Sequence, residues 1–369
     1  MVTQTATVRI FNFSAGPAVL PLPVLEQIRD EIVCLPGCGA SVMEISHRSK
    51  QFKAIQSEAA ETLARLLSVP AGYQILFLQG GSRLQFSMIP MNLLRGSEAA
   101  ADYITTGSWG AKAITEARRE GSVNEAWSGK DGGFRSLPTE ADLELTAGAA
   151  YTYITSNETI QGVQFADDPA WSDSPLVCDC SSDFLSRPID VSRYGLIYAC
   201  AQKNAGPAGV TAVIISDDLL QRSSADLPGY LNYREHADAD SMYNTPPTFA
   251  VYVLGLVAKW LRDDVGGLAA MQERNREKAR LLYDVIDASE GFYEGHVARA
   301  DRSLMNVTFR LSSDELDAKF LDEASRQGLG SLAGHRSVKG VRASIYNAMP
   351  RPGVVALRDF MRDFIAANG

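Results

Sequence analysis

The chain has 369 residues, of which 46% are hydrophobic and 21% are charged, and its formal net charge is −9. This length exceeds one ordinary hydrophobic core, so we expect a large domain and a smaller one. The negative charge argues against binding to nucleic acid or to an anionic membrane, because both partners require a positive surface. The first residues lack a signal-peptide core and no stretch is long and apolar enough to span a bilayer, which predicts a cytoplasmic protein.

The five cysteines do not form a disulfide framework in a chain of this length, and their odd number is typical of reduced thiols. Cys34 and Cys38 flank a Pro-Gly turn, whereas Cys178 and Cys180 share one face of a predicted strand. Neither pair has the two-residue gap that is usual in a four-cysteine zinc site. We therefore interpret these thiols as small buried hydrophobes and predict no metal site.

The N-terminal part contains a loop and a cluster of cations. Ser14 opens the loop Ser-Ala-Gly-Pro, which precedes a helix predicted over residues 23–32, and its hydroxyl is free to reach a ligand. His47, Arg48 and Lys50 lie next to one another, before an amphipathic helix predicted over residues 51–67. Basic residues that are grouped in an acidic protein indicate a local anion site, and we interpret Arg48 as an anion clamp.

A strand predicted over residues 73–78 turns into a helix through Gly80 and Gly81. The free amides at such a helix start, together with Ser82 and Arg83, are suited to hold a phosphate group. A further strand near residues 102–106 leaves Trp109 at the start of the next helix rather than inside an apolar stripe. Residues 121–149 are predicted to be irregular and suggest no function.

Two apolar runs in the middle of the chain each end on one charged residue. The run 175–178 ends on Asp179, and the run 196–201 is followed by Gln202 and Lys203. One connection and one strand separate the two, so both charged side chains can line the same end of a parallel sheet, where α/β proteins bind ligands. A lysine amine against an apolar wall should have a lowered pKa and can attack an aldehyde. A carboxylate that pairs with a pyridinium nitrogen and a lysine that binds the aldehyde are the groups used by pyridoxal-phosphate enzymes.

The C-terminal part alternates helices and strands after a long apolar helix predicted over residues 249–261. The expected elements are a helix at 266–288, a strand at 305–311, a helix at 314–327, a strand at 341–345 and a final helix that ends near 367. This pattern predicts a three-layer α/β/α large domain with a mostly parallel sheet over residues 16–265. A smaller α/β domain should follow over residues 266–369, with segment 1–15 packed near it.

Two histidines, His47 and His335, are followed directly by an arginine, although the chain has only four histidines. His335 and Arg336 lie in the predicted small domain, close in sequence to Arg342. The planar fork of Arg342 matches the α-carboxylate that every amino acid presents. The two His-Arg pairs should surround a second anionic group, either a phosphate or a side-chain carboxylate.

The chain resembles the phosphoserine aminotransferases, pyridoxal-phosphate enzymes of fold type I, from Asn12 to about Leu357. The matching segments are residues 12–17, 45–49, 78–83, 156–160, 181–190, 202–204 and 340–350. One departure is Ser82, which stands where the family usually has a third glycine.

The resemblance implies that Lys203 binds pyridoxal 5'-phosphate and that Asp179 holds the ring nitrogen protonated. It further implies that Trp109 stacks on the cofactor ring, that Thr159 bonds its polar edge and that Gln202 belongs to the phosphate contacts. Ser14 is then part of the substrate carboxylate site. In a homodimer with shared sites, the resemblance also implies that Asn244 and Thr245 reach the phosphate of the neighbour's cofactor.

The resulting hypothesis is reversible transamination between glutamate and 3-phosphohydroxypyruvate, which gives 2-oxoglutarate and O-phosphoserine. This reaction belongs to serine synthesis, and a parallel role in pyridoxine synthesis is compatible with it. Two alternatives stay open, an aminotransferase for small amino acids or glyoxylate and a non-catalytic protein that binds phosphate ligands. The first needs fewer cationic groups, and the second should not purify yellow.

Overall fold

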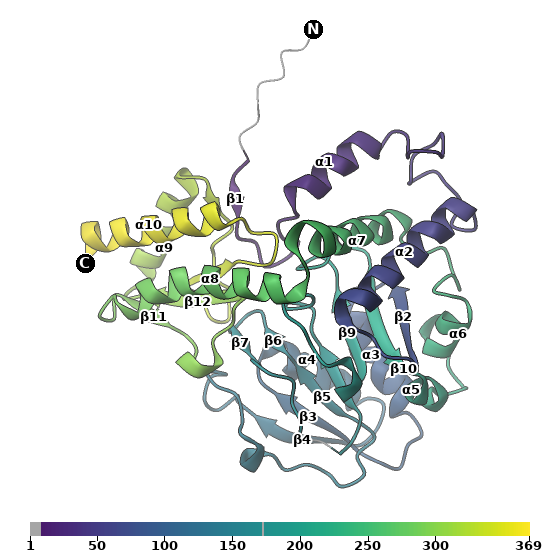
Figure 1. Cartoon of the computed structure of the whole chain (residues 1–369). Helices are drawn as coiled ribbons and strands as arrows, with labels where there is room; N and C mark the ends of the chain where they lie inside the picture. Colours follow the sequence, from purple (N-terminus) through teal and green to yellow (C-terminus); the bar gives the residue numbers. More distant parts are fainter. Residues whose placement is uncertain (1–8, 172) are drawn as a thin grey trace.

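The computed structural model describes residues 9–171 and 173–369. Its largest element is a seven-stranded sheet with the strand order β2-β10-β9-β8-β5-β3-β4 (Figure 1). These strands are β2 Tyr73–Leu78, β3 Ala101–Thr105, β4 Val123–Ser128, β5 Thr152–Thr155, β8 Leu176–Asp179, β9 Tyr194–Cys200 and β10 Thr211–Ser216. Only β10 runs antiparallel to its neighbours, so the prediction of a mostly parallel sheet is confirmed.

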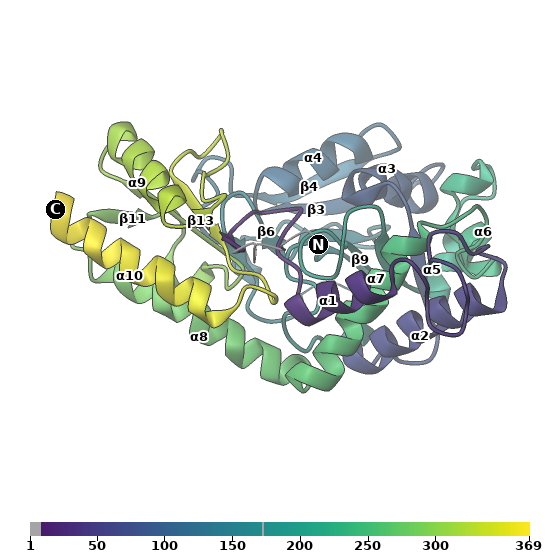
Figure 2. The same ribbon diagram turned by 90° about the horizontal axis from the view of Figure 1, so that it is seen from above.

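Helices cover both faces of this sheet, which confirms the three-layer α/β/α arrangement (Figure 2). The helices in this part of the chain are α1 Leu22–Glu31, α2 Lys50–Leu67, α3 Gly81–Leu93, α4 Ser108–Ala117, α5 Asp217–Arg222, α6 Tyr233–Asp238 and α7 Thr248–Trp260. Side chains of α2 and α7 form the core on one face, and side chains of α3, α4 and α5 form the core on the other. The sequence explains where α2 begins, because Ser49 caps this helix by accepting a hydrogen bond from the Phe52 amide at 3.2 Å.

The C-terminal region, residues 266–369, has its own hydrophobic core and a three-stranded antiparallel sheet with the order β11-β12-β14. Its elements are α8 Leu268–Asp287, β11 Tyr293–Gly295, β12 Asn306–Leu311, α9 Asp314–Arg326, β13 Leu329–Gly330, β14 Val341–Ser344 and α10 Arg351–Asn368. Strand β1, Phe11–Asn12, pairs in parallel with β13, so residues that begin the described chain lie on this region. A short hairpin, β6 Asn157–Glu158 and β7 Val163–Gln164, extends from the large sheet toward it.

The structure corrects one expectation. Residues 121–149 are not wholly irregular, because β4 forms the edge of the large sheet and pairs in parallel with β3. The apolar run after the Gly206–Gly209 turn forms β10, which lies between β2 and β9. Among the described residues, no helix is both long enough and apolar enough to cross a lipid bilayer.

Candidate active site

The carboxyl ends of β8 and β9 open into a cavity of about 330 Å³, named here the strand-end cavity. Asp179 is the last residue of β8, and Lys203 follows the end of β9 by three positions. The two strands are parallel neighbours in which Asp179 pairs with Tyr198. The cavity is lined by Ala15, Gly16, Gly80, Gly81, Ser82, Arg83, Trp109, Thr159, Ile160, Asp179, Cys200, Gln202, Lys203, His335 and Arg342. Parallel pairing thus brings the acid and the lysine to one edge of the sheet.

Lys203 lines this cavity. Its Nζ donates a hydrogen bond to Thr159 Oγ1 at 2.7 Å and lies 5.4 Å from the centroid of the Trp109 ring. Burial lowers the pKa of Lys203, but the negative charges that Cys200, Tyr346 and two buried carboxyl groups can carry raise it by more in sum. The net pKa of the Lys203 amine is raised above its ordinary value, so the expectation of a lowered pKa is wrong for the protein without a bound ligand. The sequence showed the apolar wall and placed Asp179 near Lys203, but it did not show that Glu158 and Tyr346 lie close to the amine.

Asp179 is buried in the wall of the cavity. Its Oδ1 accepts a hydrogen bond from the Ser181 amide at 2.9 Å. The pKa values of Tyr153 and Tyr198 are raised well above the usual range for tyrosine, mainly by burial and secondly by the charge of Asp179. Both hydroxyls therefore stay neutral. The neutral hydroxyls of Tyr153 and Tyr198 therefore lie next to the buried Asp179 in a low-dielectric wall, where a carboxylate charge would act strongly on a ligand.

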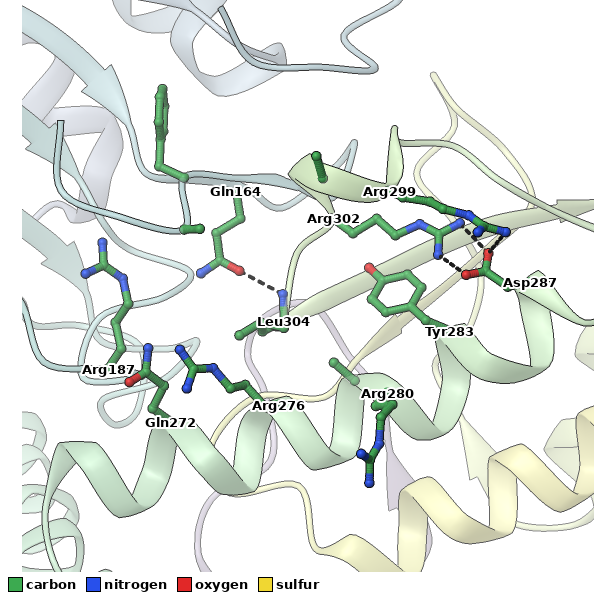
Figure 3. Close-up of a pocket in the computed structure, with 14 residues that line it drawn as sticks. Gln164, Arg187, Gln272, Arg276, Arg280, Tyr283, Asp287, Arg299, Arg302 and Leu304 are labelled. Atoms are coloured by element: carbon green, nitrogen blue, oxygen red, sulfur yellow. Dashed lines mark hydrogen bonds and ion pairs between the residues drawn. The ribbon is translucent and has the colours of Figure 1, made fainter. Parts of the chain in front are cut away.

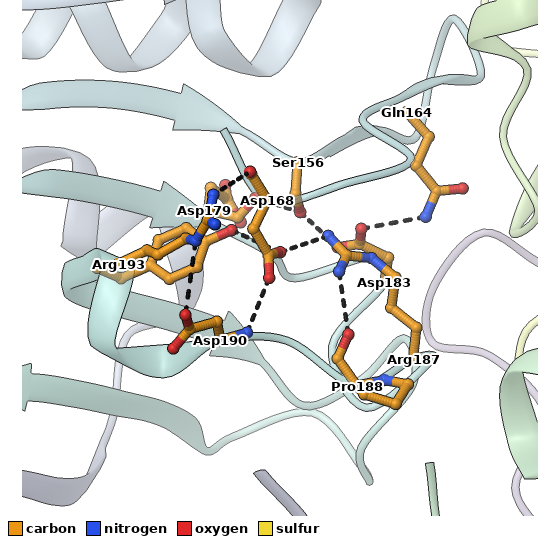
Figure 4. A network of polar contacts seen from close by, with 10 residues as sticks. Ser156, Gln164, Asp168, Asp179, Asp183, Arg187, Pro188, Asp190 and Arg193 are labelled. Atoms are coloured by element: carbon orange, nitrogen blue, oxygen red, sulfur yellow. Dashed lines mark hydrogen bonds and ion pairs between the residues drawn. The ribbon is translucent and has the colours of Figure 1, made fainter. Parts of the chain in front are cut away.

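A polar network supports the end of β8 (Figure 4). Ser156 Oγ donates to the backbone carbonyl of Asp179 at 3.2 Å and contacts the carboxylate of Asp183. Gln164 also donates to Asp183, at 3.1 Å, and Arg187 forms an ion pair with Asp168 at 2.8 Å. Burial raises the pKa of Asp183 to about 6, although its hydrogen bonds and Arg187 counteract the effect.

The turn from β2 into α3 forms a cradle at the cavity. Gly80 and Gly81 have φ angles of +87° and +63°, in the left-handed region that favours glycine. A Cβ atom at Gly80 would lie 2.5 Å from a methyl group of Leu84, so only glycine fits there. No side-chain hydrogen bond caps the start of α3 in the described chain, which leaves its first amides available to an anion. Ser82 is part of the helix, and its Oγ lies 2.7 Å from Ser181 Oγ, so the serine fits this turn.

Two residues that sequence reasoning missed place Trp109 in the cavity. The buried carboxylate of Glu158 accepts hydrogen bonds from the amides of Trp109 at 2.9 Å and Gly110 at 2.8 Å, at the start of α4. Burial raises the pKa of Glu158 to about 7, although these two amides counteract the effect. Lys112, one turn further along α4, lies with its Nζ 4.0 Å from the centroid of the Trp109 ring. The three-residue spacing of Trp109 and Lys112 was the available signal for the lysine.

The side of the cavity formed by the C-terminal region is cationic. His335 and Arg342 line it, and the Nε atom of Arg342 is buried without a hydrogen-bond partner among the described residues. Burial lowers the pKa of Arg342. Burial, followed by the charges of Arg342, Lys112 and Arg336, also lowers the pKa of His335. Arg336 does not line the cavity, but it is close enough to act on both His335 and Lys112. Cations that repel one another in this way favour the entry of anions.

Besides Arg336, five predicted site residues lie outside the cavity lining. Ser14 is next to it, and its Oγ accepts a hydrogen bond from the Gly16 amide at 3.3 Å. Asn244 donates to Gln79 Oε1 at 3.0 Å, beside the glycine turn, and Thr245 follows it. His47 and Arg48 lie in the segment between α1 and α2, away from this cavity within one chain.

Comparisons with known proteins agree with the fold. A family model described as aminotransferase class-V matches residues 10–357, and the chain belongs to this family. A protein of Rhodopirellula baltica named phosphoserine aminotransferase is 56% identical over 361 residues, which cover 98% of this chain and 96% of the relative.

Solved structures give the same result. The phosphoserine aminotransferase of Bacillus circulans subsp. alkalophilus is 47% identical, has a TM-score of 0.95 and is matched over 98% of this chain and 99% of its own. A pyridoxal-phosphate-bound phosphoserine aminotransferase of Trichomonas vaginalis is 41% identical, with a TM-score of 0.90 and coverage of 96% and 100%.

The residues of the strand-end cavity fit pyridoxal phosphate. The amides at the start of α3 have no capping side chain, Trp109 has a buried Nε1 without a partner among the described residues, and Asp179 is a buried carboxylate. A phosphate, an aromatic ring and a ring nitrogen would each find a matching group there. The described residues include no group of three or more His, Cys, Asp or Glu side chains that could hold a metal ion.

Proposed function

We propose that the chain is a pyridoxal-phosphate-dependent aminotransferase that converts 3-phosphohydroxypyruvate and glutamate into O-phosphoserine and 2-oxoglutarate, reversibly. The observation that carries the proposal is one cavity that combines Lys203 and Asp179 with an unpaired Arg342. We place this reaction in the cytoplasm, where it serves serine synthesis and has a parallel role in pyridoxine synthesis. The proposed domains are residues 16–265 and 266–369.

Pyridoxal phosphate, when bound, supplies a conjugated ring that accepts electrons from the substrate α-carbon. Lys203 would hold the cofactor through its amine until the substrate amine takes its place, and the freed lysine amine would then move a proton to and from the α-carbon as general base and acid. Asp179 keeps the ring nitrogen protonated because its carboxylate lies in a low-dielectric wall. Trp109 supports the flat face of the ring, and the contacts of Glu158 fix where Trp109 lies. The first turn of α3, with Ser82 and Arg83, would bind the phosphate of the cofactor together with Gln202. Thr159 would bind the polar edge of the cofactor ring.

The substrate is bound through its two anionic ends. Arg342, with Ser14 nearby, binds the α-carboxylate bidentately, and its unpaired buried Nε is then satisfied. His335 and Arg336 bind the phosphate of phosphoserine, or the side-chain carboxylate when glutamate takes its turn. A small amino acid or glyoxylate would leave this second group of cations without an anion, which favours the phosphorylated substrate over that alternative.

His47 and Arg48, together with Asn244 and Thr245, complete the site from a second subunit in a homodimer. The support is that these residues lie outside the cavity of their own chain, beside exposed apolar side chains. Val33 and Met43, in the segment that carries His47, are 81% and 59% exposed, and Tyr243 is 45% exposed. Apolar groups exposed in this way mark a contact surface.

A mixing experiment tests the shared site. Inactive Arg48→Leu and Lys203→Ala proteins, unfolded and refolded together, form hybrids in which one site has both an intact Lys203 and an intact Arg48. Random pairing predicts recovery of about a quarter of wild-type activity. A mixture that stays inactive although hybrids form would contradict the shared site.

A substrate panel tests the proposed activity. Purified protein is assayed for amino transfer to 2-oxoglutarate from O-phosphoserine, serine, alanine and glycine. We expect kcat/KM for O-phosphoserine to exceed that for serine by a factor of at least about 100, because a bound phosphate adds charge-assisted hydrogen bonds. Preference for alanine or glycine would establish the small-amino-acid alternative, and a protein without transamination of any donor would be the non-catalytic one.

A further inference from the structure

A second cavity, larger than the first, lies beside helix α8 and is named here the α8 cavity (Figure 3). Its volume is about 470 Å³. One wall comes from the hairpin end and the loop after β8, and the other from α8 and the segment before β12. It is lined by Gln164, Phe165, Ala166, Arg187, Gln272, Arg276, Ala279, Arg280, Tyr283, Asp287, Arg299, Ala300, Arg302 and Leu304. The lining residues thus include five arginines and a single carboxylate, in a protein whose net charge is −9.

Four of the five arginines form two groups with Tyr283 between them, whereas the guanidinium group of Arg280 is directed away from both groups (Figure 3). In the first group, Arg302 donates to both carboxylate oxygens of Asp287, at 3.0 and 2.8 Å, and stacks over the Tyr283 ring at 4.7 Å. Arg299 contacts the same carboxylate at 3.4 Å. One acid therefore serves two guanidinium groups, and the Nε of Arg302 is buried without a partner among the described residues.

The second group is formed by Arg187 and Arg276. Arg187 is 11% exposed in its side chain and pairs with Asp168, which does not line the cavity. Its Nε is also buried without a partner in the described part of the chain. Arg276 contacts only Glu273, on the exposed surface of α8, and Figure 3 shows its guanidinium group extending toward Gln272 and Arg187. Each group therefore contains one arginine, Arg302 or Arg187, whose buried Nε has no acceptor among the described residues, although Arg187 also donates to the Pro188 carbonyl at 3.0 Å and lies near Asp183.

We propose that the α8 cavity binds a small molecule with two anionic groups, carboxylates or phosphates, joined by a short spacer. One anionic group is bound by Arg187 and Arg276, and the other by Arg302 and Arg299. The spacer lies along Tyr283 and Leu304, which give the middle of the cavity an apolar surface. Guanidinium groups match the oxygens of both kinds of anion bidentately, and the volume is typical of a small-molecule site.

This site is separate from the strand-end cavity, since the two linings share no residue. They are joined by the network in Figure 4, because Gln164 contacts Asp183, and Ser156 links Asp183 to the backbone of Asp179. The proposal does not depend on which reaction the strand-end cavity catalyses.

Isothermal titration calorimetry on the cofactor-loaded protein tests the proposal, with citrate as the carboxylate probe and inorganic pyrophosphate as the phosphate probe. All variants carry Arg336→Leu, which weakens the competing anion site in the strand-end cavity. We expect Arg276→Gln to weaken binding of the preferred probe at least tenfold. The control is Arg326→Gln on α9, which removes an exposed arginine, 72% exposed against 54% for Arg276, whose acidic partner lies four residues away. Binding that is equal in Arg276→Gln and Arg326→Gln, or no binding of either probe, would overturn the proposal.

A second variant, Asp287→Asn, should increase the affinity for the probe rather than reduce it. Asp287→Asn frees Arg299 and Arg302 from their shared carboxylate, while the amide oxygen keeps one acceptor for Arg302. The preferred probe should then bind at least threefold more tightly, and its affinity should fall more steeply with salt. Unchanged or weaker binding in Asp287→Asn would contradict the assignment of the second anionic group to this end of the cavity.

Discussion

The strand-end cavity and the α8 cavity are both lined by cations, and they differ in how these cations are paired. In the α8 cavity, Arg302, Arg187 and Arg276 each contact a carboxylate. In the strand-end cavity, Arg342 has a lowered pKa and a buried Nε without a partner among the described residues. Lys112, which contacts the Trp109 ring beside this cavity, also has a lowered pKa, because burial and neighbouring cations act on it. Cations that are unpaired and perturbed by one another indicate a site whose substrate supplies the missing charge.

A second difference is the presence of groups that can perform chemistry. The strand-end cavity contains a lysine and a carboxylate at the ends of adjacent parallel strands, next to the start of a helix. The α8 cavity has arginines, which stay protonated and therefore do not act as bases. The comparison thus assigns catalysis to the first cavity and binding to the second.

The largest effect is expected from Lys203→Ala. This variant removes the proposed base, so turnover should fall at least about 1,000-fold, near the upper part of the range for general acid–base catalysis. The variant should stay folded, because Lys203 makes one side-chain hydrogen bond, to Thr159. Steady-state rates and circular dichroism measure the two outcomes, with Lys319→Ala on the exposed face of α9 as the control. Normal turnover in Lys203→Ala would contradict the assignment of catalysis to the strand-end cavity.

A smaller loss is expected from Asp179→Asn. The amide keeps an acceptor for the Ser181 amide, but it cannot hold the ring nitrogen charged in a buried wall. The protein should retain cofactor, measured by its absorbance, while kcat falls about 100- to 1,000-fold, as when one preorganised electrostatic group is lost. Asp322→Asn, on the surface of α9, is the control. Near-normal rates in Asp179→Asn would show that another acid does this work.

The two arginines of the strand-end site should be separable by substrate. Arg336→Leu should weaken kcat/KM for O-phosphoserine by about 2–4 kcal/mol, the range for breaking a charge-assisted pair, with little change for serine or alanine. Arg342→Leu should weaken phosphorylated and unphosphorylated amino acids alike, because all of them present an α-carboxylate. Equal losses on all substrates in Arg336→Leu would contradict the phosphate-site assignment.

The smallest effect concerns the pH dependence of stability. Burial raises the pKa of Glu158 to about 7 from 4.5, so the folded state holds this proton more tightly than the unfolded state. The contribution is present below about pH 4.5 and is lost as pH rises through 7. Relative to Glu158→Gln, the wild-type cofactor-free protein should lose about 1–3 kcal/mol of unfolding free energy between pH 5 and pH 8. Urea denaturation at several pH values measures this difference, and curves that stay parallel would show that Glu158 does not titrate there.

Local sequence patterns predict the parallel core of the fold and the position of its strand ends. The apolar runs before Asp179 and Lys203 form neighbouring strands, since buried parallel strands need continuous apolar residues and a polar residue ends them. The sequence does not predict strand β4, because it is an edge strand with exposed polar side chains such as Glu125. The apolar run that forms β10 does not indicate that this strand is antiparallel or that it lies between β2 and β9.

Contacts between distant residues could not be predicted from the chain. Glu158 meets the amides of Trp109 and Gly110 across 48 residues or more, and the pKa of Lys203 depends on Tyr346, which lies in the C-terminal region. The α8 cavity is likewise built from segments that are far apart in sequence, so the grouping of its arginines appears only in the folded chain.

The most direct test of the strand-end cavity as the catalytic site is to find the lysine that holds the cofactor. Borohydride reduction of the purified yellow protein, followed by proteolysis and mass spectrometry, fixes the cofactor to that lysine. The structure predicts that the colour is lost and that the label is on Lys203, with none on Lys112, although the amines of both lysines lie close to the Trp109 ring. A label on any other lysine, or a colourless protein that takes no label, would contradict the account.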